Sequence, residues 1–357
     1  MLIVRSPVRI SFGGGGTDLP AYFTEFGGGV LSASIDKYFY TLVSRRTDGK
    51  IQVISSDLKV TETWDDIRET PVDTTRLGIV LSTLKHMDRH FGADLFLASE
   101  IPPGTGLGSS ASVCVNILKA ISEICHVPLS RYELAATAYT IAHDVLQKPV
   151  GKQDEYAAAF GGLNYIHFNQ DDSVNVEPLV AEPDTIQQLH DNLMLFFTGV
   201  SHDSWSILKQ QDKDTRTSGS KSLDALHNIK QYGLRMRSAL EQGELQDFGT
   251  MLDEAWQQKK QVTQGISSER IDHLYSLARA NGALGGKITG AGGGGFLLLY
   301  CEAEHQPRVR AAFAVEGSSE MMFKFDLMGA QLLVDDPFLD ADQKGGRMWR
   351  FVPAEVS

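Results

Sequence analysis

The sequence has few cysteines, no long apolar run and no excess of positive charge. Its three cysteines, Cys114, Cys125 and Cys301, have spacings that fit no metal-binding motif, so we expect reduced thiols in the core. A membrane-spanning helix needs an apolar run of about 18 residues, which is absent. The first residues are too charged for a signal peptide. These absences predict a cytoplasmic protein with no membrane partner.

The net charge is −12, from 33 Lys and Arg against 45 Asp and Glu. Binding of nucleic acid needs a basic surface, so we expect no nucleic-acid partner. A small phosphorylated ligand would need a local site of glycines, amide groups and a few cations. The length of 357 residues favours two domains, and a polar, turn-rich segment over 171–184 suggests the boundary. We expect domains over 1–178 and 179–357.

Apolar periodicity predicts an alternation of strands and helices in the first half of the chain. Expected strands cover 2–12, 38–45, 93–99, 163–169, 193–198 and 295–300, with 49–55 as the hairpin partner of 38–45. Expected helices cover 75–91, 110–125, a segment opened by the capping box Ser130–Glu133, 204–210, 223–242, 248–264 and 268–281.

Glycine is the most informative residue type. Of the 34 glycines, 19 lie in five clusters, at 13–16, 27–29, 104–108, 161–162 and 285–295. Scattered loop glycines would not cluster in this way. Clusters predict places where the backbone adopts positive φ or lies against a ligand.

The cluster at 104–108 precedes a strongly periodic helix and forms a predicted phosphate cradle. Free amide groups at a helix N-terminus bind anions, and glycines let the anion approach. The nucleotide-binding residues expected here are Gly104, Thr105, Gly106, Leu107, Gly108, Ser109, Ser110 and Ala111. Two alternatives are a dinucleotide fingerprint, G-x-G-x-x-A, and a purely structural Gly-Ser turn. The fingerprint is disfavoured because Pro102 and Pro103 separate the strand from the first glycine.

Three other segments carry candidate chemistry. Asp154 falls in the first turn of a short Ala-rich helix, where an ionised carboxylate could accept a hydroxyl proton. Arg9 enters the first glycine cluster, which ends in Thr17 and Asp18, side chains suited to sugar hydroxyls. Five glycines within six residues, 290 and 292–295, form the third loop. Taken alone, each segment except the phosphate cradle is a weak signal.

Together and in this order, the three loops resemble the signature motifs of the GHMP kinases. The central motif, P-x-G-x-G-L-G-S-S-A, is highly specific. The segments RISFGGGGTDLP and GKQDEYAAAFGG look most like the D-glycero-D-manno-heptose 7-phosphate kinases. The resemblance implies an α+β, two-domain fold, with a first domain like ribosomal protein S5 domain 2 and a ferredoxin-like second domain. It also implies ATP, Mg²⁺ and a small sugar phosphate substrate.

The same resemblance assigns roles to residues at matching positions. Asp154 matches the catalytic aspartate, Arg9 the basic residue of the first motif, and Gly104–Ser110 the ATP phosphate loop, with Ser110 on Mg²⁺. The substrate-binding residues that we expect are Gly15, Gly16, Thr17, Asp18, Lys152, Gly292 and Gly293.

Two positions depart from the family pattern. Ala142 stands where the family usually has a Mg²⁺-binding glutamate, and we expect Asp144 to take over that role. His202 stands where the heptose kinases commonly have an arginine. A kinase for a neutral sugar such as L-fucose or galactose, and a catalytically silent sugar-sensing regulator, stay open as alternatives. A homodimer is also left open.

Overall fold

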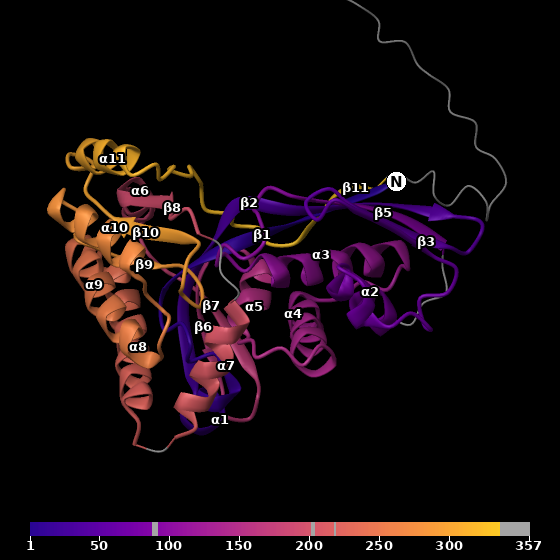
Figure 1. Ribbon diagram of the computed structural model, residues 1–357, viewed down its shortest axis with the longest axis horizontal. Helices are drawn as coiled ribbons and strands as arrows, with labels where there is room; N and C mark the ends of the chain where they lie inside the picture. Colours follow the sequence, from indigo (N-terminus) through magenta and orange to yellow (C-terminus); the bar gives the residue numbers. More distant parts are fainter. Residues whose placement is uncertain (88–91, 201–203, 218, 336–357) are drawn as a thin grey trace, which may run out of the picture.

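The computed structural model describes residues 1–87, 92–200, 204–217 and 219–335 (Figure 1). Its strands are β1 Leu2–Gly13, β2 Gly28–Arg46, β3 Ile51–Ser55, β4 Val60–Trp64, β5 Gly92–Ser99, β6 Leu163–Phe168, β7 Val174–Pro178, β8 Leu193–Phe197, β9 Gly285–Ile288, β10 Phe296–Tyr300 and β11 Gln331–Asp335. Its α-helices are α1 Pro20–Phe26, α2 Gly78–His86, α3 Ser109–Ile124, α4 Arg131–Thr140, α5 Gln153–Phe160, α6 Pro183–Asn192, α7 Ser204–Thr215, α8 Lys221–Gln242, α9 Leu245–Val262, α10 Glu269–Ala280 and α11 Gln306–Val315.

The larger sheet has eight strands, with the order β11-β1-β2-β5-β3-β4 and β6 and β7 branching from β2. The branch arises because β2 is 19 residues long. One end of β2 pairs with β6 from Gly28 to Ala33, and the other pairs with β5 from Phe39 to Arg46. Helices α2, α3, α4 and α5 cover one face of this sheet, on the right of Figure 1.

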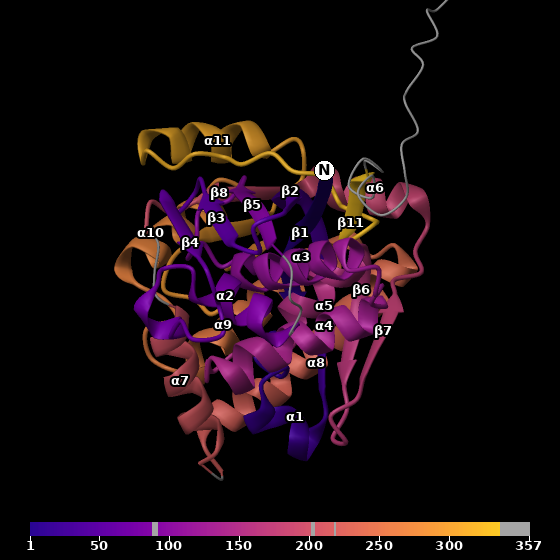
Figure 2. The same ribbon diagram turned by 90° about the vertical axis from the view of Figure 1, so that its right-hand side faces the viewer.

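The smaller sheet has the order β8-β10-β9, and all three strands are antiparallel to their neighbours. Helices α8 to α11 surround it, on the left of Figure 1, and Figure 2 shows α11 at the end of the molecule opposite α1. β11 returns from this half to pair with β1, so residues 331–335 join the sheet of the first half. The domain boundary predicted after residue 178 falls between β7 and α6, and it stays a prediction.

Most predicted elements are confirmed, but the hairpin between 38–45 and 49–55 is wrong. β3 pairs with β4 and, in parallel, with β5, which lies between it and β2. The segment 171–184, which is polar and turn-rich in the sequence, contains β7 and the beginning of α6. Turn-type residues there belong to a short exposed strand and a helix opened by proline, which composition alone does not reveal.

Helix α3 is the element that fixes the phosphate loop. Its apolar face, with Ile117, Ile121 and Ile124 buried, packs on β1 and β2 and anchors the helix against the sheet. The capping box predicted for α4 is present, since the Ser130 hydroxyl accepts from Glu133 N at 3.2 Å. Within the described ranges, no helix is long and apolar enough to cross a membrane.

Candidate active site

A cavity of about 330 Å³ lies between the two halves of the molecule. From the first half it is lined by β1, the glycine loop before α1, the phosphate loop, the start of α3 and the start of α5. From the second half it is lined by α7, α9, β9 and the loop after β9. The three glycine-rich loops identified in the sequence therefore meet at one cavity.

Asp154 and Arg9 form the central ion pair of this cavity. The Arg9 Nη2 lies 2.5 Å from Asp154 Oδ1, and Nε donates to the same oxygen at 2.7 Å. Arg9 is buried, whereas the Asp154 side chain keeps 28% of its surface exposed toward the cavity. Burial raises the pKa of Asp154, while the positive charge of Arg9 lowers it. A carboxylate held in this way can accept a proton from a bound hydroxyl.

Arg9 also connects the ion pair to the phosphate loop. Its Nη1 donates to the carbonyl oxygen of Gly106 at 2.7 Å, and its backbone N–H donates to Leu107 O at 3.0 Å. The position of Arg9 on the buried strand β1 fixes both contacts. One side chain therefore sets the distance between the start of α5 and the phosphate loop.

The phosphate loop has the geometry of an anion cradle. Gly104, Gly106 and Gly108 all have positive φ, between 76° and 81°, directly before the N-terminus of α3. The Ser109 hydroxyl is buried without a hydrogen-bond partner among the described residues. Every predicted loop residue lines the cavity except Leu107, which is fully buried.

Gly106 has the positive φ expected from the sequence, and close packing against another loop is a further reason for glycine there. A Cβ there would lie 2.4 Å from the carbonyl oxygen of Thr289, in the third loop. At Gly108 a Cβ would lie 3.2 Å from the Asp154 carboxylate. Close packing of loop on loop, together with positive φ, requires these glycines before any phosphate is considered.

Of the four substrate-binding residues predicted in the first glycine loop, three line the cavity and one does not. Gly15, Gly16 and Asp18 line the cavity, and Asp18 Oδ2 accepts from Gln153 Nε2 at 3.1 Å. The buried Thr17 hydroxyl instead donates to Gly14 O at 2.7 Å and accepts from Gly29 N at 3.0 Å. Thr17 thus stabilises the loop, and the structure does not bring it to the cavity with Asp18.

The three other expected substrate residues, Lys152, Gly292 and Gly293, are not in the cavity lining. Lys152 Nζ pairs with Asp172 at 2.7 Å and packs over the Phe23 and Tyr139 rings. Gly293 N donates to Ile266 O at 2.9 Å, and a Cβ at Gly292 would meet the same residue. The part of the third loop that lines the cavity is Gly290 and Ala291.

Of the two expected metal ligands, only Ser110 lines the cavity. Ser110 lies exposed in the cavity at the start of α3. Asp144 is on a π-helical turn, Ile141–Val145, with its side chain 61% exposed and paired to His143 Nδ1 at 2.7 Å. Ala142 lines the cavity, but Asp144 does not. His202 lies outside the described residues.

Sequence reasoning missed several cavity residues, above all Lys259 on α9 and Lys287 on β9. Lys259 is on the apolar face of its helix, beside the buried Ala255, Trp256 and Val262. A lysine on the apolar face of a helix indicates a candidate functional site, because lysine is rarely fully buried unless it is paired. Glu155 also lines the cavity, and burial raises its pKa well above the usual value.

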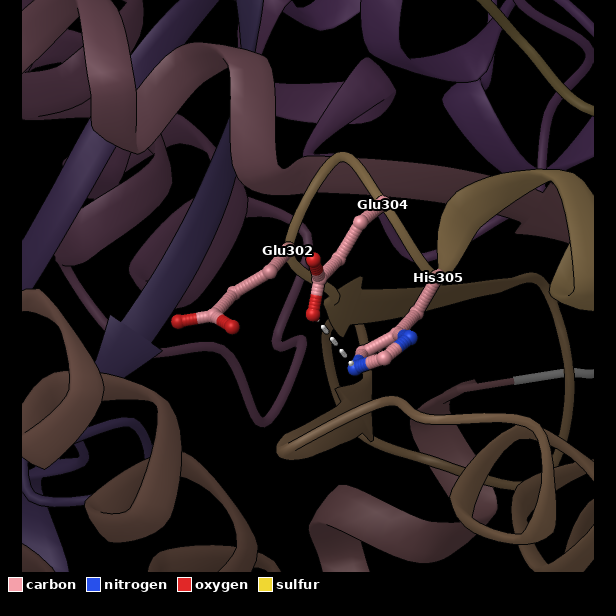
Figure 3. Close-up of side chains that lie close together, drawn as sticks. All are labelled: Glu302, Glu304 and His305. Carbon is pink, nitrogen blue, oxygen red and sulfur yellow. Dashed lines mark ion pairs between the residues drawn. The ribbon is translucent and has the colours of Figure 1, made fainter.

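A separate group of metal-ligating residue types lies at the start of α11, away from the cavity. Glu302, Glu304 and His305 hold ligand atoms within 4.8 Å of one another (Figure 3). His305 Nε2 pairs with Glu304 Oε1 at 3.2 Å, and Glu302 accepts from Gln246 at 3.0 Å. Glu304 and His305 pair with each other and Glu302 is bonded to Gln246, so we assign the group no ligand.

Comparison with known proteins places the chain in a family. It matches the GHMP kinases N terminal domain over residues 78–162 and the GHMP kinases C terminal domain over residues 236–317. It is 32% identical over 335 residues to a D-glycero-alpha-D-manno-heptose 7-phosphate kinase of Campylobacter jejuni, covering 92% of this chain and 97% of that one.

Two further relatives extend the comparison. An L-fucokinase/L-fucose-1-P guanylyltransferase of Bacteroides fragilis is 25% identical over 90% of this chain, which spans 38% of that enzyme. The crystal structure of a D-glycero-D-manno-heptose 1-phosphate kinase from Bacteroides thetaiotaomicron superposes with a TM-score of 0.79 at 27% identity, covering 94% of this chain and all of the other. The predicted α+β, two-domain fold is confirmed, and the chain belongs to the GHMP kinases.

Proposed function

We propose that the protein is an ATP-dependent sugar kinase acting on D-glycero-D-manno-heptose 7-phosphate. It transfers the γ-phosphoryl group of ATP to the anomeric C1 hydroxyl and yields the 1,7-bisphosphate, a precursor of nucleotide-activated heptose for surface polysaccharide. The observation that carries the kinase assignment is the Arg9–Asp154 pair beside the phosphate loop in one cavity. The heptose assignment is supported by the 32% identity to the Campylobacter jejuni enzyme.

The proposed reaction is a direct in-line transfer. The acceptor oxygen bonds to the γ-phosphorus, the bond from that phosphorus to the β,γ-bridging oxygen breaks, and ADP leaves. Asp154 accepts or orients the hydroxyl proton, and Arg9 offsets the negative charge on the carboxylate and on the transferring group. An anomeric hydroxyl is more acidic than an ordinary alcohol, which suits a carboxylate base.

The nucleotide and its metal ion fit the start of α3. The glycine cradle and the unpartnered Ser109 hydroxyl suit phosphate oxygens, and Ser110 offers a ligand to Mg²⁺. Mg²⁺ keeps several waters and needs few protein ligands, and when bound it neutralises phosphate charge. Among the described residues that line the cavity, the carboxylates are Asp18, Asp154 and Glu155. We assign Asp18 to sugar hydroxyls, together with the backbone of Gly15 and Gly16.

A panel of sugars and sugar phosphates, incubated with Mg-ATP and followed by ³¹P NMR, tests the proposal. A new anomeric phosphate signal with heptose 7-phosphate is the expected result. Product from L-fucose alone would favour a neutral-sugar kinase, the alternative supported by the Bacteroides fragilis relative. A chain that binds a sugar and transfers no phosphate to any member of the panel would be a silent regulator.

A further inference from the structure

Lys259 and Lys287 are buried ammonium groups that face the cavity without an acidic partner. Their residues are only 6% and 7% exposed, and both line the cavity from the second half of the chain. Within the described part of the chain, neither ammonium forms an ion pair. Lys259 Nζ donates to Gln211 Oε1 at 3.3 Å, which satisfies one of its three donors. A buried cation of this kind is costly unless an anion accompanies it.

The surrounding charges compensate these two cations only in part. The Arg9 charge is matched by Asp154. The Asp18 carboxylate, whose Oδ1 accepts from the Gly16 N–H at 2.8 Å, raises the pKa of both lysines but forms no ion pair with either one among the described residues. Burial, together with the positive charges of Lys259 and Arg9, lowers the pKa of Lys287 to about 7, and Asp18 opposes this shift. Burial likewise lowers the pKa of Lys259 to about 8, opposed by Asp18. An incoming anion would restore both ammonium groups to full charge.

A third donor without a partner lies next to Lys259. The Nε2 of Gln211, on α7, is buried and forms no hydrogen bond with a described residue. A Cβ built on Gly16 would lie 2.6 Å from this nitrogen and 3.5 Å from Lys259 Nζ. Two ammonium groups and an amide N–H₂ are all donors, and the dianion of a phosphate monoester offers only acceptor oxygens.

Two of these groups, Lys259 and Gln211, lie beside the first glycine loop, which we assign to the acceptor sugar. The phosphate loop and the N-terminus of α3, which suit the nucleotide, come from the first half of the chain. Lys259 and Lys287 line the cavity from the second half. Gln211 is fully buried outside the lining, and it lies with Lys259 next to Gly16, in the loop that carries Asp18. A ligand that extends from Asp154 past Asp18 would bring its far end to Lys259.

We propose that Lys259 and Lys287, with Gln211, bind the phosphate monoester that the acceptor sugar already carries. They thereby make the enzyme selective for a phosphosugar over the corresponding neutral sugar. This assignment rests on the proposed function and replaces Lys152, which the fold commits to Asp172.

The test compares two acceptors that differ only in the phosphate: heptose 7-phosphate and the heptose left after phosphatase treatment. We expect the wild type to prefer the phosphorylated acceptor in kcat/KM by roughly 10²-fold or more, the scale of a charge-assisted contact. Lys259→Met and Lys287→Met should each remove most of this preference by lowering kcat/KM for heptose 7-phosphate, with a much smaller fall for the heptose. Equal losses on both acceptors would overturn the assignment.

Two further variants secure the interpretation. Lys260→Met removes the next charge on α9, from a partly exposed side chain outside the cavity lining, and should leave the preference intact. Gln211→Glu places a carboxylate beside Lys259 without truncating any lysine, and should also abolish the preference even if a methionine variant folds poorly.

Calorimetric titration of heptose 7-phosphate into the nucleotide-free enzyme separates this inference from the proposed function. Transfer to the neutral heptose with an equal or higher kcat/KM would leave a sugar kinase in place and overturn the lysine assignment. If no sugar is phosphorylated, the proposed function fails. Tighter binding by the wild type than by Lys259→Met would then still support the assignment, and equal affinity would overturn it.

Discussion

The Arg9 guanidinium holds the Asp154 carboxylate through two nitrogen atoms, at 2.5 and 2.7 Å from the same oxygen. The third nitrogen of the same guanidinium donates to Gly106 O in the phosphate loop. The other carboxylate oxygen of Asp154 has no described hydrogen bond and remains available to a substrate hydroxyl. This relationship motivates the first two predictions.

Asp154→Asn should lower kcat by roughly 10²-fold or more, because the amide keeps the size of the side chain but cannot accept the hydroxyl proton. The affinity for ATP, measured by calorimetry, should change little. Asp184→Asn is a matched control, since Asp184 is an exposed acid in the first turn of α6. Near wild-type kcat in Asp154→Asn would remove this carboxylate from the mechanism.

Arg9→Met should shift the acid limb of the pH profile to higher pH, in addition to lowering the rate. Only the ionised Asp154 acts as a base, so kcat/KM rises as pH increases through its pKa in the free enzyme. Burial raises that pKa and Arg9 lowers it, so loss of Arg9 should raise it further.

Arg9→Lys, which keeps the charge, should show the smaller shift. All variants are assayed with one acceptor, so that ionisation of the acceptor itself cancels in the comparison. An acid limb that stays in place or moves to lower pH in Arg9→Met would contradict the assigned role of this charge.

The sequence predicted the three loops, because glycine clusters and a specific motif are local signals, and the structure shows that they meet at one cavity. The structure brings Arg9, Asp18 and Asp154, all named from the sequence, to one cavity, and their roles stay predictions. Thr17 and Lys152 were expected in the same place, yet their polar atoms are used by backbone groups and by Asp172. Only the three-dimensional structure shows which polar side chains the fold has already satisfied.

Lys259 was missed because no local sequence signal links it to the other cavity residues. It lies more than 100 residues from Asp154 in the sequence and belongs to no local motif, so its place in the cavity depends on how α9 packs against the first half. The branching of β2 and the return of β11 are likewise long-range pairings. Short-range periodicity carries no information about them.

Asp144→Ala should leave the Mg²⁺ concentration for half-maximal activity unchanged. The sequence predicted that this acid replaces the missing family glutamate, but its side chain is exposed, paired with His143 and outside the cavity lining. Ser110→Ala is the comparison, and it should raise the Mg²⁺ requirement because Ser110 lies in the cavity at the start of α3. A raised requirement in Asp144→Ala would restore the prediction from sequence.

The last prediction concerns alkaline pH and the phosphorylated acceptor. In the free enzyme the pKa values of Lys287 and Lys259 are lowered to about 7 and about 8, so both lose charge as pH rises from 7 to 9. A bound dianion favours the charged ammonium groups, so binding takes up protons and weakens as pH increases. The KM for heptose 7-phosphate should therefore rise by up to roughly tenfold per pH unit for each ammonium that must gain a proton.

The KM for the unphosphorylated heptose should not follow this rise, and Lys259→Met should show a shallower slope. Calorimetry of heptose 7-phosphate binding in two buffers of different ionisation enthalpy measures the proton uptake directly. Arg9 and Asp18 face the same region, but they are common to both acceptors and cancel in the comparison. A KM for heptose 7-phosphate that stays flat from pH 7 to 9, with no proton uptake, would show that the two lysines do not bind its phosphate.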